Sequence, residues 1–164
     1  MKRLPALFLT LGIFAVAPTA SGKPENGQVF GEWRAFCESA ESGGPEDCHV
    51  FQHLVAKDTQ ESILHAMVLY TPKRADPVMI LTLPLGVAVR AGVQVQVDAG
   101  EPRKLIFETC LPEGCRAGML LDAKALDEFR KGAQAGVSFF NLRGKQLNLP
   151  LSLSGFTKAV SSLQ

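Results

Sequence analysis

The sequence predicts a mainly β domain, either a sandwich or a partly closed barrel, with two short helices added to it. Residues 93–98 alternate strictly between apolar and polar side chains, which is the pattern of a half-buried strand. Further short apolar runs recur along the chain, and turns rich in Gly and Pro separate them. The length of 164 residues suits a single domain.

The strands are expected in the order in which the apolar runs occur. The first covers 28–37, and residues 48–56 and 62–70 form a hairpin through the polar segment 57–61. The remaining runs predict strands at 78–83, 87–90, 93–98, 104–110, 116–120 and 137–142. If Ala56 pairs with Glu61 in the hairpin, Gln52 lies opposite His65.

Two short helices are expected in the second half of the chain. Asp122 is a good N-cap for a helix over 123–131, and Gly132 is placed to end it. Ser154 is a candidate cap for a C-terminal helix, whose apolar residues recur at helical spacing: Phe156, Ala159, Val160 and Leu163. This helix is expected to pack on the sheet, with a partner-binding helix as the alternative.

The first 21 residues are predicted to be a cleaved signal peptide. A positive start at 1–3 precedes an apolar run over 4–17, and small residues follow around Ala20 to Gly22. The single domain is then 22–164, with 15 basic and 16 acidic residues after Lys2 and Arg3 are removed. This balance argues against nucleic-acid binding. No later apolar stretch is long enough to span a membrane. Because of the predicted signal peptide, a periplasmic location is expected, with surface association or secretion as further possibilities.

Four cysteines lie in the part of the chain that is expected to be exported, where an even number indicates disulfides. The pairs Cys37–Cys48 and Cys110–Cys115 are favoured, because each flanks a short loop rich in turn residues. A zinc site made by all four thiolates is the first alternative, but the longer spacing does not fit one. The second is a redox pair at Cys110 and Cys115, which lack the usual C-x-x-C spacing.

The candidate binding residues are few, and each has a structural interpretation. In the hairpin register above, His49 and His53 share a face with Phe51, whereas His65 lies on the other face. Two alternate histidines bind a metal only weakly, so no metal site is predicted. Trp33 is either a core residue or a platform for a ligand. Nucleophile-elbow and phosphate-binding motifs are absent from the sequence, so neither an enzyme nor a cofactor is expected.

Several short motifs resemble the invasion-associated locus B (IalB) family of exported bacterial proteins. The resemblance begins at Gly31-Glu32-Trp33 and continues with the spacing of Cys37 and Cys48. It includes Leu83-Pro84-Leu85-Gly86-Val87 and is strongest over residues 109–118, which begin Thr-Cys-Leu-Pro-Glu-Gly-Cys. It ends in residues 151–159, which read Leu-Ser-Leu-Ser-Gly-Phe-Thr-Lys-Ala.

The resemblance implies an immunoglobulin-like β-sandwich in a periplasmic or surface-exposed protein of Gram-negative bacteria. It carries no catalytic residue to this chain. We therefore expect a disulfide-stabilised interaction or accessory module that contacts another envelope or host protein, with strand addition at an exposed sheet edge as the natural mode of contact. The alternative is a periplasmic metal- or small-ligand-binding protein that uses His49 and His53 near Trp33 or Phe51.

Overall fold

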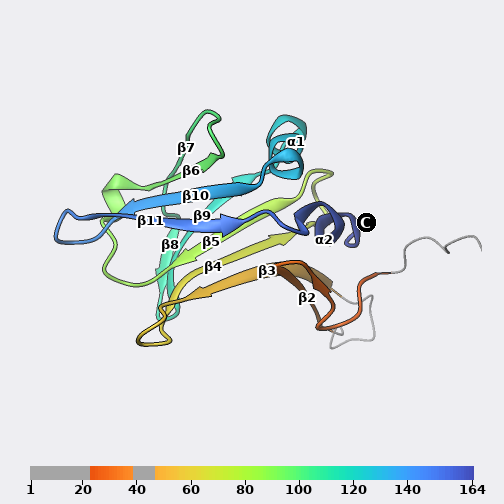
Figure 1. The fold of residues 1–164 in the computed structure, drawn as a ribbon, viewed down its shortest axis with the longest axis horizontal. Coiled ribbons are helices and arrows are strands. Elements are labelled where there is room, and N and C mark those ends of the chain that lie inside the picture. Colours follow the sequence, from red (N-terminus) through yellow and green to blue (C-terminus); the bar gives the residue numbers. More distant parts are fainter. Residues whose placement is uncertain (1–22, 39–46) are drawn as a thin grey trace, which may run out of the picture.

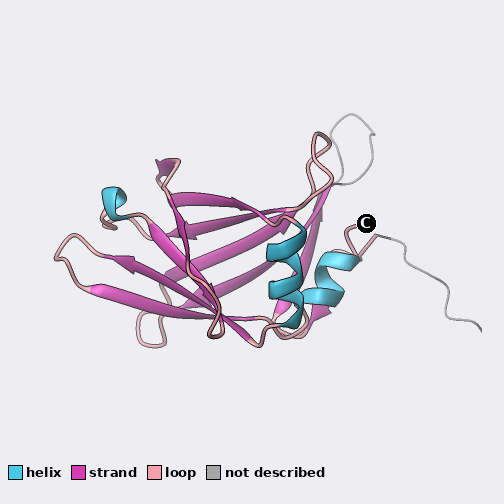
Figure 2. Ribbon diagram, turned by 90° about the horizontal axis from the view of Figure 1, so that it is seen from above, coloured by secondary structure: helices cyan, strands magenta, loops and turns pink. Residues whose placement is uncertain are grey.

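The computed structural model describes residues 23–38 and 47–164, which form two facing antiparallel sheets and two helices (Figures 1 and 2). The predicted mainly β class is confirmed. The predicted signal peptide and most of the loop between Cys37 and Cys48 lie outside the described residues. No helix in the described part of the chain is long and apolar enough to cross a membrane.

The larger sheet has seven strands in the order β1-β2-β3-β4-β5-β9-β8. Their bounds are β1 Val29–Phe30, β2 Trp33–Glu38, β3 Asp47–Val55, β4 Ser62–Leu69, β5 Val78–Leu83, β8 Thr109–Leu111 and β9 Gly114–Leu120. The smaller sheet has the order β11-β10-β6-β7. Its strands are β6 Val93–Val97, β7 Arg103–Leu105, β10 Gln134–Phe140 and β11 Gln146–Ser152.

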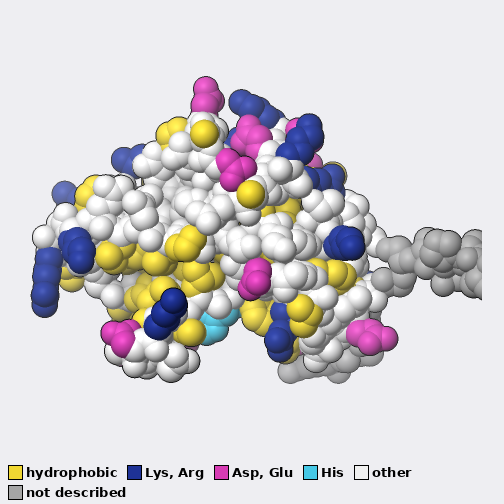
Figure 3. Space-filling model, viewed as in Figure 1, with side chains coloured by type: hydrophobic (Ala, Val, Ile, Leu, Met, Phe, Trp, Pro, Cys, Tyr) yellow, Lys and Arg dark blue, Asp and Glu magenta, His cyan; other side chains and the backbone are white. Residues whose placement is uncertain are grey.

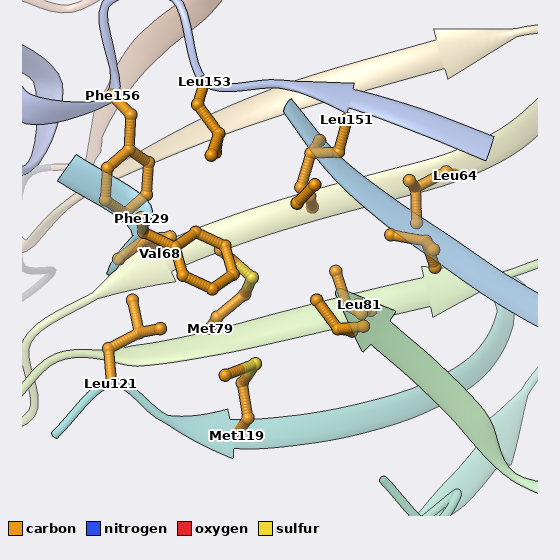
Figure 4. Packing of buried hydrophobic residues seen from close by; sticks show 14 of the residues in the cluster. Leu64, Val68, Met79, Leu81, Met119, Leu121, Phe129, Leu151, Leu153 and Phe156 are labelled. Atoms are coloured by element: carbon orange, nitrogen blue, oxygen red, sulfur yellow. The ribbon is translucent and has the colours of Figure 1, made fainter. Parts of the chain in front are cut away.

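The core lies between the sheets, because alternate side chains of each strand point inward. In β5 every second residue is buried, including Met79 and Leu81. Figure 4 shows these side chains directed toward Leu151, near the end of β11, and Leu153, just after that strand. Burial of these apolar side chains holds the two sheets together.

The helices close one end of the space between the sheets (Figure 2). Asp122 accepts a hydrogen bond from the backbone N–H of Ala125 at 2.8 Å and so caps α1, Ala123–Lys131, which ends at Gly132 as predicted. The second helix, α2, covers Phe156–Ser161. The rings of Phe129 and Phe156 lie 5.5 Å apart and are fully buried. The predicted cap at Ser154 is wrong, because Gly155, with φ of 85°, occupies the N-cap position without a side-chain cap.

Trp33 and Gln52 connect the first strands to the end of β11. The indole N–H of Trp33 and the side-chain amide of Gln52 both donate to the carbonyl of Ser152, at 3.0 Å each. Gln52 also accepts a hydrogen bond from the backbone N–H of Ser152. The Trp33 ring packs edge-on against Phe156 at 5.2 Å. The segments that carry the first and last family motifs are therefore neighbours in the fold.

Three of the predicted strands differ from the structure. A turn at Gly31, with φ of 60°, divides 28–37 into β1 and β2. Residues 104–110 are divided between β7 and β8, which belong to different sheets. At 87–90, a single bridge at Val87 is followed by a turn of 3₁₀ helix, Val89–Ala91.

The strand β11 is not among those predicted from the sequence. Its leucines alternate with polar residues, but Pro150 interrupts the run in a way that usually argues against a central strand. As an edge strand of the smaller sheet, β11 accommodates this proline.

Candidate functional site: the outer face of the larger sheet

The most distinctive surface is the side of the larger sheet that points away from the core. We call this surface the outer face, and its central side chains come from β2, β3, β4, β5 and β9: Phe36, His49, Phe51, His53, His65, Met67, Leu69, Val78, Ile80 and Leu120. In the part of the chain that the structure describes, neither helix packs across it (Figures 1 and 2).

The strand register arranges these side chains in rows across the sheet. One row runs from Phe36 through His49 and Leu69 to Val78 and Leu120. Most of the central side chains are half-buried by their neighbours, but Phe36 and Leu120 at the ends remain 37% and 41% exposed. Contiguous apolar surface of this kind is a feature of interaction sites.

Five rings form a continuous ladder across β2, β3 and β4. Phe36 lies 5.3 Å from His49, measured between ring centroids, and His49 lies 6.1 Å from Phe51. The ladder continues from Phe51 to His65 at 5.3 Å and from His65 to His53 at 5.7 Å. These separations fit weakly attractive aromatic contacts. The ladder therefore presents flat apolar rings together with imidazole nitrogens.

The position of His65 corrects the register expected from the sequence. Ala56 and Glu61 are joined as predicted, with the backbone N–H of Ala56 donating to Glu61 at 2.8 Å. A bulge then shifts the pairing by one residue, so His53 and not Gln52 lies opposite His65. A one-residue shift exchanges the two faces of a strand. As a result, all three histidines share the outer face.

The three histidines do not converge on one point. His53 and His65 are neighbours, whereas the Phe51 ring separates His49 from them. The Nε2 atom of His53 is also 2.9 Å from the hydroxyl oxygen of Ser62. Among the described residues, no group of three His, Cys, Asp or Glu side chains is placed to hold a metal ion. A metal held by His49 and His53 together therefore has no support from this geometry.

The ring ladder lowers the pKa of two of its histidines. Burial lowers the pKa of His49, and the nearby Glu38 carboxylate opposes this shift only in part. Burial also lowers the pKa of His65, and the positive charges of His53, His49 and Arg116 act in the same direction. The lowered pKa values favour the neutral form of both imidazoles, which is compatible with an apolar face.

This arrangement predicts that acidification destabilises the fold. The folded pKa values of His49 and His65 lie below the unfolded value, so the unfolded chain binds more protons as the pH falls through that window. The free energy of unfolding should be lower at about pH 5 than at about pH 7.5. Urea unfolding at both values measures this difference, and His65→Gln should reduce it. Equal pH dependence in the variant and the parent chain would contradict the assignment to His65.

Charged side chains border the outer face. Arg34, Glu38 and Asp47 lie on the β2–β3 side, and Arg116 lies on β9. The Glu108 carboxylate covers Gly118, where a Cβ atom would be 2.8 Å from its Oε1 atom. The border therefore carries both signs of charge, as expected for a protein-binding surface with an apolar centre.

A small cavity lies at the β2–β3 side of this face. It has a volume of about 250 Å³ and is lined by Glu32, Arg34, Phe51, Gln52 and His53. Of the residues that the sequence singled out for ligand binding, only Phe51 and His53 line this cavity. His49 lies farther along the ladder. Trp33 is fully buried in the core, as in the structural one of its two interpretations, so its ring offers no exposed face to a ligand.

The four cysteines form two pairs, and the two members of each pair lie directly opposite each other in the strand register. Disulfides join Cys37 to Cys48 across β2 and β3, and Cys110 to Cys115 across β8 and β9. These are the two pairs that the turn-rich loops in the sequence predict. Among the described residues no cysteine is free. Both bonds therefore brace strands of the larger sheet.

Much of the outer face was missed in the sequence. Phe36, Met67, Leu69 and Ile80 were interpreted only as strand residues, because an apolar run does not reveal which of its residues face a partner sheet. A signal was present in β4, where apolar residues occupy both faces of the strand. In an antiparallel sheet, that pattern indicates that neither face is a simple solvent-facing one.

Comparison with known proteins gives a consistent family assignment. The family model described as "Invasion associated locus B (IalB) protein" matches residues 33–164. Invasion protein B homologs from two Brucella abortus strains, 2308 and biovar 1 strain 9-941, are each 26% identical over 139 residues. The match covers 84% of this chain and 78% of each relative. A crystal structure of invasion associated protein B from Bartonella henselae superimposes with a TM-score of 0.71 at 25% identity. It covers 83% of this chain and 92% of that one.

Proposed function

This chain belongs to the invasion associated locus B family, and from that premise we propose that it is an exported, non-enzymatic protein that binds another protein of the cell envelope or of a host cell. The outer face carries this proposal. It combines a ring ladder, aliphatic neighbours and a border of mixed charge on one sheet surface, across which neither helix of the described residues packs.

Export is supported by the leader-like sequence at 1–21 and by the two disulfides. Disulfides persist in oxidising compartments such as the periplasm and the exterior of the cell. A periplasmic location follows from this proposal, with surface association or secretion as later steps. The relatives from Brucella abortus are named as invasion protein homologs, and their names describe no catalytic activity.

A pair of matched variants tests the outer face. Met67 lies at its centre, between Phe51 on β3 and Ile80 on β5. Met67→Glu adds a carboxylate there, and desolvating it against a partner should weaken binding by about tenfold or more. Gln94→Glu adds the same charge at an exposed position of β6 on the other sheet and serves as the control.

The measurement is quantitative capture of proteins from envelope extracts of the bacterium that encodes this chain. A partner that is retained by the parent chain and by Gln94→Glu, but is lost with Met67→Glu, supports the proposal. Equal unfolding transitions of the three proteins show that the variants are folded. Retention by Met67→Glu, or no reproducible partner at all, contradicts binding through the outer face.

A small polar ligand is the second candidate function. The cavity at Glu32, Arg34 and His53 supports it. Beside the Phe51 ring, these side chains offer an acidic group, a basic group and an imidazole as hydrogen-bonding partners. The same variants distinguish the two functions. Met67 does not line this cavity, so binding of a small ligand there should survive Met67→Glu.

A further inference from the structure

An edge strand and an apolar cavity lie together at the end of the sandwich that the helices leave open. The edge strand β11 borders it, and a cavity of about 220 Å³ opens beneath that strand. The lining is apolar apart from Gly86 and Asn141, and its main side chains are Ile63, Leu85, Val87, Leu147 and Leu149. In Figure 3, hydrophobic side chains form a band between β11 and the β3–β4 hairpin. We infer that this edge and the cavity together bind an extended, acidic strand of a partner protein.

The backbone of β11 offers hydrogen-bonding groups to such a strand. Ser152 uses its backbone N–H and C=O to bond Gln52 and not β10, so both groups point away from the smaller sheet. Antiparallel pairing repeats every second residue. The carbonyl of Pro150 and the N–H and carbonyl groups of Asn148 and Gln146 therefore point the same way. Pro150 has no N–H, and it is tolerated there because the ladder with β10 needs none at that position.

The Gln52 side chain already forms the contacts that an added strand would make at Ser152. Its amide donates to the Ser152 carbonyl and accepts from the Ser152 N–H, at 3.0 Å each. Beyond this point β11 pairs with no other strand among the described residues on that side. A partner strand would therefore begin beside Pro150 and continue past Asn148 to Gln146.

The cavity selects apolar side chains at alternate positions of that strand. Leu147 and Leu149 point from β11 into the space between the sheets, where they line the cavity. A neighbouring strand in register would direct every second side chain into the same space. A volume of about 220 Å³ is several times the share of one water molecule, about 30 Å³, and its apolar lining gives water few partners.

Charge favours an acidic partner. The sequence contains no Asp or Glu after Glu128, whereas Arg143 and Lys145 lie in the hairpin between β10 and β11. Within the described residues neither of these two side chains forms an ion pair. Carboxylates near one end of the bound strand would complement this hairpin. On the β3–β4 hairpin, Asp58 accepts a hydrogen bond from the backbone N–H of Thr59 within its own turn.

The same geometry disfavours a second copy of this chain. If Asn148 of two copies paired across an axis, each Pro150 would lie opposite Gln146 of the other copy. Proline has no N–H, so two hydrogen bonds of that ladder would be lost. In such a dimer, the hairpin of each copy that carries Arg143 and Lys145 would also lie beside a β11 strand that contains no acidic residue.

The test measures binding of a fluorescein-labelled nonapeptide in which alternating valines and threonines precede two C-terminal aspartates, so that antiparallel pairing with β11 places the aspartates beside Arg143 and Lys145. We expect saturable binding to the full chain by fluorescence anisotropy. Gln146→Pro removes one outward N–H and should weaken binding by about fivefold, whereas Gln146→Ala keeps the N–H and should not. Arg143→Glu combined with Lys145→Glu should weaken it by at least the same factor.

Controls with the unchanged protein keep the test independent of folding. A peptide N-methylated at alternate amides cannot pair with β11 and should not bind, and a peptide with lysines in place of the aspartates should bind more weakly. Saturable binding that Gln146→Pro and N-methylation both leave intact overturns the proposal, as does no binding of the aspartate peptide. If the chain dimerises in sedimentation experiments and Gln146→Pro abolishes the dimer, the proposal of a partner strand is wrong and a second copy of the chain occupies this edge. Met67→Glu should bind the peptide normally, so this result is separate from that for the outer face.

Discussion

Replacing Trp33 by alanine is expected to lower the free energy of unfolding by about 3–5 kcal/mol, as is usual for truncating a large buried aromatic side chain. Trp33 is fully buried, packs edge-on against Phe156 and donates its indole N–H to Ser152. The substitution therefore opens a cavity between the first strands and the end of β11. Urea unfolding followed by circular dichroism measures the change.

Trp33→Phe separates packing from hydrogen bonding in the same place. It keeps a ring against Phe156 but loses the hydrogen bond to the Ser152 carbonyl, which Gln52 continues to satisfy. Its cost should therefore be smaller than that of alanine, about 1–2 kcal/mol. An unfolding free energy that Trp33→Ala leaves unchanged would show that this residue does not support the core.

Removing the disulfide between Cys37 and Cys48 is expected to cost about 2–4 kcal/mol, because the cross-link no longer restricts the unfolded chain. The two residues are direct partners in the β2–β3 register, with Cα atoms 4.1 Å apart. The double variant Cys37→Ser with Cys48→Ser tests this by urea unfolding. These strands also carry Phe36 and His49, so the change should loosen one side of the outer face.

The second disulfide provides the matched comparison. Cys110 and Cys115 are five residues apart in sequence, compared with eleven for the first pair. A shorter loop restricts the unfolded chain less, so Cys110→Ser with Cys115→Ser should cost less than the first double variant. The reverse order would indicate that native contacts, and not loop length, dominate the two contributions.

Local patterns explain which parts of the fold could be predicted. The strict alternation at 93–98 became β6, and Asp122 caps the helix that it was expected to cap. The loops between the cysteines led to the two pairs that the structure contains. Each of these features depends on residues that are close together in sequence.

The predictions that were wrong concern residues that are far apart in sequence and come together only in the fold. The bulge between Leu54 and Val55 depends on how β4 packs in the sheet, and it reversed the predicted face of His65. Pro150 argued against a strand at the position of β11, because a proline is compatible with a strand only when its nitrogen faces away from the ladder. Whether it does so depends on which neighbour the strand has, and the sequence does not contain that information locally.

The sequence by itself determined the mainly β class, the adjacent cysteine pairs and the cap of α1. Side-chain period, turn chemistry and loop length act over a few residues, so one chain is enough to show them. The tertiary structure alone decided that the three histidines share a face, that Trp33 is buried and that β11 is an edge strand. Strand register and sheet order join segments that are distant in sequence, and their free energy comes from packing that no local pattern contains.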